Sequence, residues 1–162
     1  MLLYASTGIR GQETKFDFFL LHCLTSMHAM HTLLPHLSSS QVEQCFRGHV
    51  VQSLILYVRC GRPSLEIQSL RNYKAPSTDS YHCNDNPWLD VIRRALHAPD
   101  VHCIKAIRAL ALGQVVYRDA FKDNEDLWLQ AAQATLNAAG VHNEVHKCWN
   151  YDGIGFEETW SQ

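Results

Sequence analysis

The side chains that could take part in the most kinds of reaction in this 162-residue chain are its ten histidines. Four of them lie in residues 15–36. A histidine can bind a metal ion or move a proton near neutral pH. The same stretch holds three phenylalanines and five leucines, so these histidines have apolar neighbours. A buried polar ring needs a partner. Each histidine is therefore either a functional group or a core residue that hydrogen-bonds to a neighbour, and the residue types alone leave both open.

Apolar positions in this stretch recur every three or four residues, which predicts a buried helix over residues 15–34 that Pro35 ends. On that helix His22 shares a face with aromatic and hydroxyl side chains. Those that could line a substrate pocket are Phe18, Phe19 and Ser26. His28 and His31 lie on another face, so one helix cannot bring all of its histidines to one point. At most two of them share a site.

Further stretches carry helix-period apolar stripes with capping or stop signals, and we predict helices there. These helices span residues 41–60, 87–97, 100–112 and 124–139. Residues 65–74 add a short helix, while residues 1–14 look like a connector. No stretch shows the alternation typical of a strand. The predicted fold is all-α without a sheet, a bundle-like array around one central buried helix.

The second long helix should begin with a capping box made by Ser40 and Glu43. Because the turn before it is short, it should pair antiparallel with the central helix, and positions whose numbers add to about 76 then lie at equal height. His49 points at the core from this second helix. Its position along the hairpin axis favours His28 as its neighbour on the central helix. The helix faces do not show which histidine His49 contacts.

The composition limits which kinds of protein this chain could be and which partners it could bind. Hydrophobic residues make up 46% and charged residues 19%, a balance typical of one globular domain. The net charge is -2 without a basic cluster, so we expect neither nucleic acid nor a membrane as a partner. The six cysteines form no CxxC pair and no compact secreted framework. This predicts free thiols in a reducing compartment, which makes the cytoplasm the expected location.

Several common catalytic motifs are missing from the sequence. There is no phosphate-binding glycine motif, so the sequence contains no recognisable binding site for a nucleotide cofactor. There is no GxSxG motif either, so acyl transfer of the hydrolase type has no support. The segment HNEVH at residues 142–146 differs from the HExxH of zinc peptidases in the place of its glutamate. His82, Cys83 and Asp85 are ligand types in a turn-rich loop, and we assign them to the surface. A zinc-dependent hydrolase therefore ranks last among the functions considered.

Segments distributed along nearly the whole chain resemble the C-terminal part of the questin oxidase-like family of fungal proteins. They read KFDFFLLHCLTS, ILYVRCGRPSL, DVHCIKAIRALALG, DLWLQAA and GIGFEETW. The resemblance implies an oxidoreductase that uses dioxygen to cleave a ring of an anthraquinone-type polyketide, in a Baeyer-Villiger-like oxygen insertion. It also implies NADPH or a non-haem iron held by histidines as the cofactor. Residues 1–162 would form the C-terminal portion of a larger all-α domain.

His22 and His102 match histidines of the family, and with His49 they are the candidate metal ligands. No carboxylate partner is obvious in the sequence. Two ligand-type positions depart from the family pattern: Thr14 stands where a histidine often precedes the first motif, and Gly48 with His49 replaces a tryptophan-lysine pair. The oxidase reaction needs an aromatic-lined cavity and a redox centre, because no side chain activates dioxygen unaided.

Family members are far longer, so a site built partly from other segments would be incomplete here. We therefore expect that this chain is not a competent enzyme alone. A helix that is apolar on nearly every face needs neighbours on every side, so some apolar surface should be left bare. That surface could mediate a homo-oligomer. The alternative function is a non-catalytic helical interaction module, a truncated paralogue whose histidines are core residues.

Overall fold

The computed structural model describes residues 1–75, 86–120, 126–139 and 148–161. The loop residues His82, Cys83 and Asp85 and the HNEVH segment lie outside the described residues. The described elements are, in chain order, α1 (Leu2–Ala5), β1 (Ile9–Arg10), β2 (Glu13–Thr14), α2 (Phe18–Leu33), the 3-10 turn η1 (Leu34–His36), α3 (Ser39–Arg59), α4 (Ile67–Arg71), α5 (Pro87–Ala95), α6 (Val101–Val116), α7 (Asp126–Ala139) and the 3-10 turn η4 (Glu157–Thr159).

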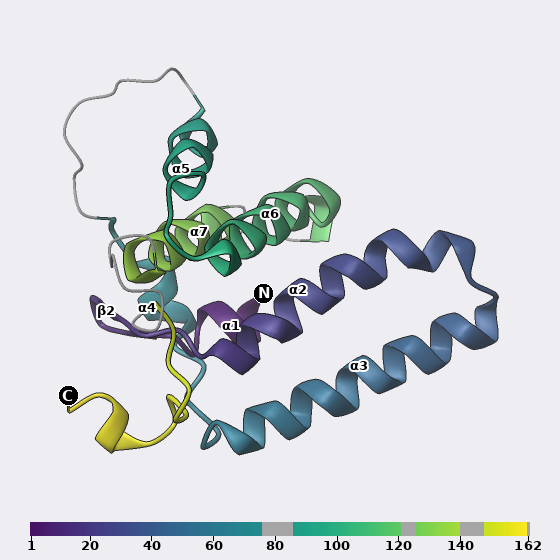
Figure 1. The fold of residues 1–162 in the computed structure, drawn as a ribbon, viewed down its shortest axis with the longest axis horizontal. Helices are drawn as coiled ribbons and strands as arrows, with labels where there is room; N and C mark the ends of the chain where they lie inside the picture. The colour runs from purple at the N-terminus through teal and green to yellow at the C-terminus, as the bar shows by residue number, and fades with distance from the viewer. Residues whose placement is uncertain (76–85, 121–125, 140–147, 162) are drawn as a thin grey trace.

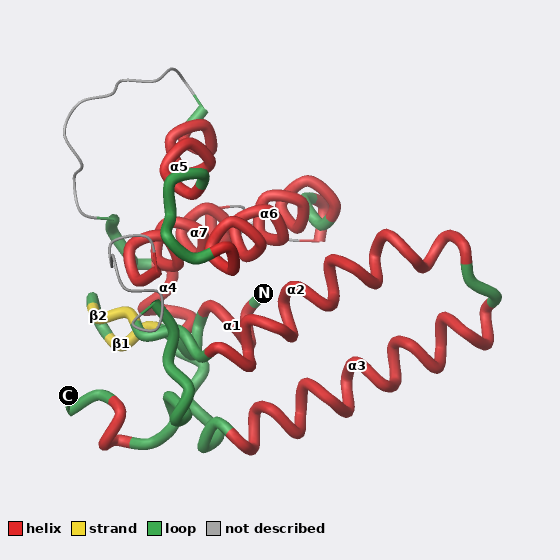
Figure 2. Tube along the Cα trace, in the orientation of Figure 1, coloured by secondary structure: helices red, strands yellow, loops and turns green. Residues whose placement is uncertain are grey.

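The all-α prediction is confirmed, because helices dominate the described residues (Figure 2). The prediction of a connector over residues 1–14 without any sheet is wrong, since α1 and an antiparallel hairpin of β1 and β2 lie there. Ile9 pairs with Thr14, and Gly11 turns the chain with a φ of 62°. Strands of two residues are too short to show an alternating pattern in the sequence.

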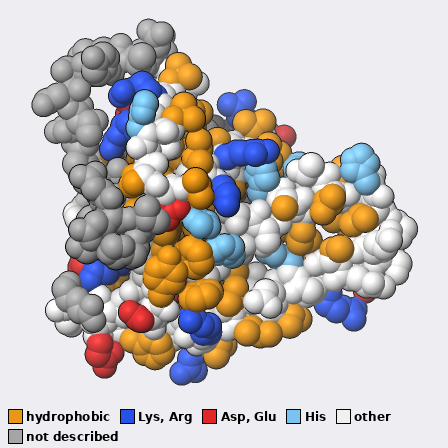
Figure 3. Space-filling view, viewed as in Figure 1, with side chains coloured by type: hydrophobic (Ala, Val, Ile, Leu, Met, Phe, Trp, Pro, Cys, Tyr) orange, Lys and Arg blue, Asp and Glu red, His pale blue; other side chains and the backbone are white. Residues whose placement is uncertain are grey.

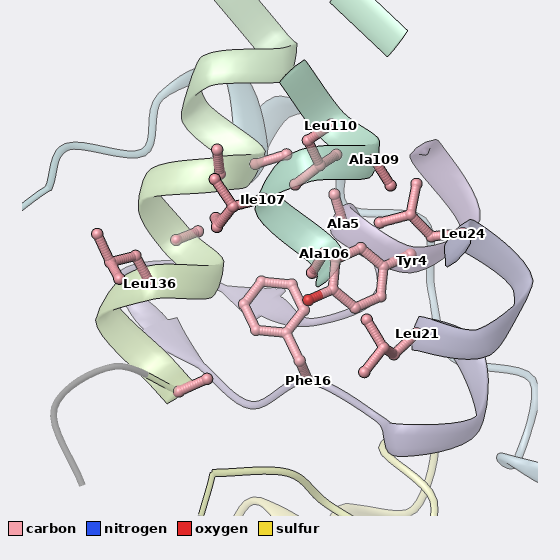
Figure 4. Close-up of a cluster of buried hydrophobic side chains, with 14 of the residues drawn as sticks. Tyr4, Ala5, Phe16, Leu21, Leu24, Ala106, Ile107, Ala109, Leu110 and Leu136 are labelled. Atoms are coloured by element: carbon pink, nitrogen blue, oxygen red, sulfur yellow. The ribbon is translucent and has the colours of Figure 1, made fainter. Parts of the chain in front are cut away.

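The core forms where α1, the first half of α2, α6 and α7 meet (Figure 4). Tyr4 stacks on Phe16 with the ring centres 4.9 Å apart, and its hydroxyl hydrogen-bonds to Thr135 of α7 at 3.0 Å. Buried aliphatic side chains of α2, α6 and α7 surround this pair: Leu21, Leu24, Ile107, Leu110 and Leu136. Burying one such side chain contributes about 1.5–3 kcal/mol, so the cluster fixes α2 against α6.

α2 and α3 form the predicted antiparallel hairpin, which extends from the core as an arm (Figure 1). α2 begins at Phe18 because Asp17 caps it, accepting hydrogen bonds from the backbone of Phe19 and Leu20. Its buried side chains end at Leu24. The prediction of a helix buried along its whole length is wrong for the second half, since the arm leaves the core beyond that point.

α3 has no buried side chain, although it is 21 residues long. Its exposed large apolar side chains form what we call the α3 stripe: Phe46, Val50, Val51, Leu54, Ile55 and Val58. Figure 3 shows hydrophobic side chains at the surface of this arm. The expectation of bare apolar surface is thus confirmed. None of the described helices is long and apolar enough to cross a membrane.

The capping box of α3 lies two residues before its predicted position. Ser38 accepts a hydrogen bond from the backbone of Gln41, whose side chain accepts one from the backbone of Ser38. Ser38→Ala should therefore lower the free energy of unfolding by about 1 kcal/mol. Ser40→Ala, inside the first turn, should change it by less than about 0.5 kcal/mol. Urea denaturation of both variants checks this, and a larger loss for Ser40→Ala would contradict it.

Candidate active site

The candidate site lies where the start of α2, the start of α6 and the C-terminal tail meet. Asn150 of the tail joins the backbone on both sides of Asp17. Its N–H donates to the carbonyl of Phe16 at 2.8 Å, and its carbonyl accepts from the N–H of Phe18 at 2.9 Å. This bridge places Tyr151 against Phe18, with the ring centres 4.8 Å apart. The tail is thus positioned on α2 by backbone hydrogen bonds.

Three rings form what we call the aromatic cluster: Phe18, Phe19 and Tyr151. Phe19 meets Phe18 edge to face at 5.8 Å between ring centres, and the guanidinium of Arg59 lies 3.6 Å from the centre of the Phe19 ring. Both phenylalanines are half-buried and Tyr151 is exposed, so the cluster offers aromatic surface to solvent. Two of the predicted pocket residues, Phe18 and Phe19, therefore lie at the site.

His102, beside the aromatic cluster, is held by a buried carboxylate. Its ring centre is 5.0 Å from that of Phe18. Asp100, which is 4% exposed, receives hydrogen bonds at 2.8 Å from the backbone N–H of His102, from its ring Nδ1 and from the indole of Trp149. Asp100 therefore caps α6, orients the His102 ring and anchors the tail at once.

The hydrogen bonds to Asp100 keep this carboxylate ionised. Burial by itself would raise the pKa of Asp100, but the bonds from the backbone and ring of His102 and from Trp149 outweigh burial and hold the pKa below its ordinary value. An ionised carboxylate on Nδ1 fixes the ring tautomer, with the proton on Nδ1 and a lone pair on Nε2. The pair can therefore take up a proton at the Nε2 atom of His102.

His22 stands next to His102, with the ring centres 5.7 Å apart. Its Nδ1 lies 2.7 Å from the carbonyl oxygen of Phe18. A carbonyl only accepts, so Nδ1 of His22 carries the proton, as does Nδ1 of His102 toward Asp100. Both rings therefore keep an unprotonated Nε2 in the neutral form, which is the nitrogen left for a proton or a ligand.

Two sequence predictions about the arm need correction. His22 was expected to face the interior but is exposed, because its face of α2 points toward His102 and the aromatic cluster rather than into the core. Ser26 does not join that cluster; its hydroxyl lies 3.3 Å from Nδ1 of His49 on α3. This contact agrees with the predicted register of the hairpin, and it gives His49 a partner other than His28.

A three-histidine iron site requires three ligands around one ion. The part of the chain that the structure describes contains no group of three histidine, cysteine, aspartate or glutamate side chains placed to hold a metal. Asp100 contacts Nδ1 of His102, so it is a hydrogen-bond partner of that ring and not a third ligand for an ion at Nε2. The described residues thus do not fit a complete iron site. The assignment of His22, His49 and His102 as ligands stays a prediction, and the structure brings two of them together.

Sequence reasoning identified Asp100 only as the start of a helix, and it missed Trp149 and Tyr151. Asp100 carried a local signal, because the Pro-Asp pair before an apolar stripe is a helix start. Its second role depends on Trp149, which is far away in the sequence and meets it only in the fold. Tyr151 lies in an irregular tail, where no periodicity indicates which residues are neighbours.

Comparisons with known proteins show which proteins the chain is similar to. The model of the Questin oxidase-like family matches residues 1–110, which include α2 and the start of α6. Baeyer-Villiger oxidase mdpL from Emericella nidulans is 31% identical over 149 residues, which cover 86% of this chain and 32% of that protein. Baeyer-Villiger oxidase GME11358 from Pestalotiopsis microspora is 27% identical over 143 residues, which cover 79% of this chain and 30% of that protein.

No solved structure matches the chain. The chain spans about a third of the length of the curated relatives that it matches. The family match covers well over half of the chain, and the matched segment holds the neighbouring pair His22 and His102. The chain therefore belongs to the questin oxidase-like family.

Proposed function

We propose that the chain is an oxidoreductase that inserts oxygen into a ring of an anthraquinone-type polyketide, and that its substrate binds at the aromatic cluster. The observation that carries this proposal is His102, oriented by Asp100 and placed against Phe18 and His22. Relatives named as Baeyer-Villiger oxidases support the reaction class. Under this proposal, residues 1–162 correspond to the C-terminal portion of the family domain.

The side chains of the site would have separate roles. A flat hydroxylated substrate would stack on the half-buried ring of Phe18 and the exposed ring of Tyr151. Nε2 of His102 would accept the proton of a phenolic hydroxyl, which makes the ring richer in electrons, and the carboxylate of Asp100 would stabilise the imidazolium that forms. His22 would hold a second polar group of the substrate through its own Nε2.

The overall reaction needs a source of electrons. One atom of dioxygen enters the bond beside a ring carbonyl and the other leaves as water, which consumes two electrons. NADPH, the reductant that the family resemblance implies, would supply them. Non-haem iron is the alternative redox centre, with His22 and His102 as two of its ligands. The roles proposed for His22, His102 and Asp100 do not involve iron, since the described residues do not complete its site.

Labelled dioxygen tests the proposed function. The chain, NADPH and a hydroxylated anthraquinone are incubated under ¹⁸O₂, with and without added ferrous iron, and the product mass is measured. We expect a ring-opened product that carries one labelled oxygen. His102→Gln should lower its yield by about 100-fold or more, since positioned acid-base groups contribute about that factor. His97→Gln, at an exposed position in the turn after α5, serves as the control and should leave the yield unchanged. Absence of product under every condition would contradict the proposal.

A second candidate function is a non-catalytic interaction module, and the α3 stripe favours it. Under this proposal a second copy of the chain covers the stripe. The expectation that the chain alone is not a competent enzyme concerns the oxidase as well and stays a prediction, and the labelled-dioxygen experiment decides between it and turnover by this chain. Failure to form labelled product, together with a dimer in sedimentation, would support this candidate. Cys23, Cys45, Cys60 and Cys103 are free thiols, which supports the proposed cytoplasmic location.

A further inference from the structure

A cavity opens on the side of α2 away from the candidate active site. Its volume is about 370 Å³, within the usual range of about 300–1,000 Å³ for small-molecule sites. α2 contributes Leu24 and His28 to the lining, the second half of α6 contributes Gly113 and Val116, and α7 contributes Trp128. His22 does not line it, because His28 lies on a different face of the helix. The cavity is therefore separate from the aromatic cluster.

Aromatic planes form one wall of this cavity. Tyr117 stacks on Trp128 with an interplanar angle of 10° and 6.3 Å between ring centres, and His31 meets Tyr117 edge to face at 6.4 Å. Gly113 makes this wall possible, since a Cβ atom there would overlap the Trp128 ring. An apolar cavity with stacked rings on one side favours a flat aromatic occupant.

One polar atom of the lining lacks a partner. Nδ1 of His28 is buried and has no hydrogen bond among the described residues. A buried ring nitrogen without a partner costs about 1–3 kcal/mol, so a ligand in the cavity that hydrogen-bonds to it would gain affinity. Burial, Arg108 and His31 together lower the pKa of His28, so its ring is neutral near pH 7. A neutral ring can hydrogen-bond to a hydroxyl, but it offers no charge to an anion.

We propose that the cavity between α2, α6 and α7 binds an uncharged planar aromatic molecule with a hydroxyl group, which stacks beside Tyr117 and hydrogen-bonds to His28. This goes beyond the proposed function and does not depend on it. A chain without oxidase activity would bind the same molecule, and a chain that oxidises its substrate at the aromatic cluster would bind a second molecule here.

The test measures the binding of three two-ring probes by equilibrium dialysis. We expect 2-naphthol to bind most tightly, naphthalene about fivefold more weakly because it lacks the hydroxyl, and 2-naphthalenesulfonate at least tenfold more weakly because it is charged. His28→Phe should weaken 2-naphthol about fivefold and leave naphthalene unchanged. This substitution removes the unpartnered nitrogen and keeps a ring, so we expect the variant to fold.

Filling variants locate the bound probe. Val116→Trp should abolish binding of both naphthalene and 2-naphthol, because the new ring enters this cavity. Ile92→Trp is the matched control: Ile92 is 40% exposed, like Val116 at 37%, but it lines a neighbouring cavity against α5. His28 and His31 line both cavities, so this control decides which of the two holds the probe. His22→Phe controls for the aromatic cluster. Binding that survives Val116→Trp, or that is lost in Ile92→Trp or His22→Phe instead, would overturn the proposal, as would equal affinity for all three probes.

Discussion

Asp100→Asn is expected to lower the free energy of unfolding by about 2–3 kcal/mol, the largest effect of any polar substitution that we predict. The buried carboxylate accepts three hydrogen bonds, from the backbone and ring of His102 and from Trp149. Hydrogen bonds to a charged group contribute about 1.5–3 kcal/mol. In asparagine the oxygen can still accept from His102, but the charge is lost and the NH₂ group that replaces Oδ2 cannot accept from Trp149. Urea denaturation measures the loss. Asp90→Asn, which breaks surface ion pairs with Arg93 and Arg94, is the control and should cost less than about 1 kcal/mol.

The same substitution should change how stability depends on pH. The pKa of Asp100 is held below its ordinary value in the fold, so folding is favoured while the carboxylate is ionised. Its contribution is complete above the ordinary aspartate pKa near about 4 and is lost as the pH falls through the lower, folded value. The parent chain should therefore lose more stability below about pH 4 than Asp100→Asn does. Parallel acid profiles for the two proteins would contradict this role of Asp100.

Gly155→Ala is expected to cost about 2–3 kcal/mol and to detach the C-terminal tail. The N–H of Gly155 donates to the carbonyl of Cys60 at 2.8 Å, so the tail lies directly on the end of α3. A Cβ on Gly155 would overlap the backbone of Gly61, which cannot move aside as a flexible side chain could. Overpacking of this kind costs about 1–3 kcal/mol. Near-ultraviolet circular dichroism should report the loss of fixed surroundings for Trp149 and Tyr151.

Gly48→Ala is the matched control for this prediction. Gly48 lies inside α3, and a Cβ there has no neighbour within 4 Å. Alanine is a better helix former than glycine by about 0.8–1 kcal/mol, so this variant should be more stable than the parent chain. A Gly155→Ala protein as stable as the Gly48→Ala protein, with an unchanged aromatic spectrum, would show that the tail does not need the close approach at Gly155.

The sequence predicted the elements that have strong local signals. The helix period and the stops at Gly61 and Pro35 were sufficient for α2 and α3, and the contact between Ser26 and His49 agrees with the predicted register. Burial could not be predicted in the same way. An apolar stripe such as that of α3 shows that a helix has a face to cover, and the fold decides whether anything covers it.

The candidate site was predicted only in part for a similar reason. His22, Phe18 and Phe19 are on one helix face, so their proximity follows from local geometry. His102 joins them because the core packs α2 against α6, and the backbone bridge of Asn150 adds the tail. These contacts join segments separated by long stretches of chain, so no spacing rule indicates them.

The central claim is that His22 and His102 stand side by side with a proton on Nδ1 and a free Nε2. Long-range ¹H–¹⁵N correlation spectra of the histidine rings, recorded on the intact chain at a pH where the rings are neutral, test it directly. We predict the Nδ1–H tautomer for both residues and a nuclear Overhauser effect between the two rings, whose centres are 5.7 Å apart. An Nε2–H tautomer in either ring, or the absence of any contact between them, would contradict the account.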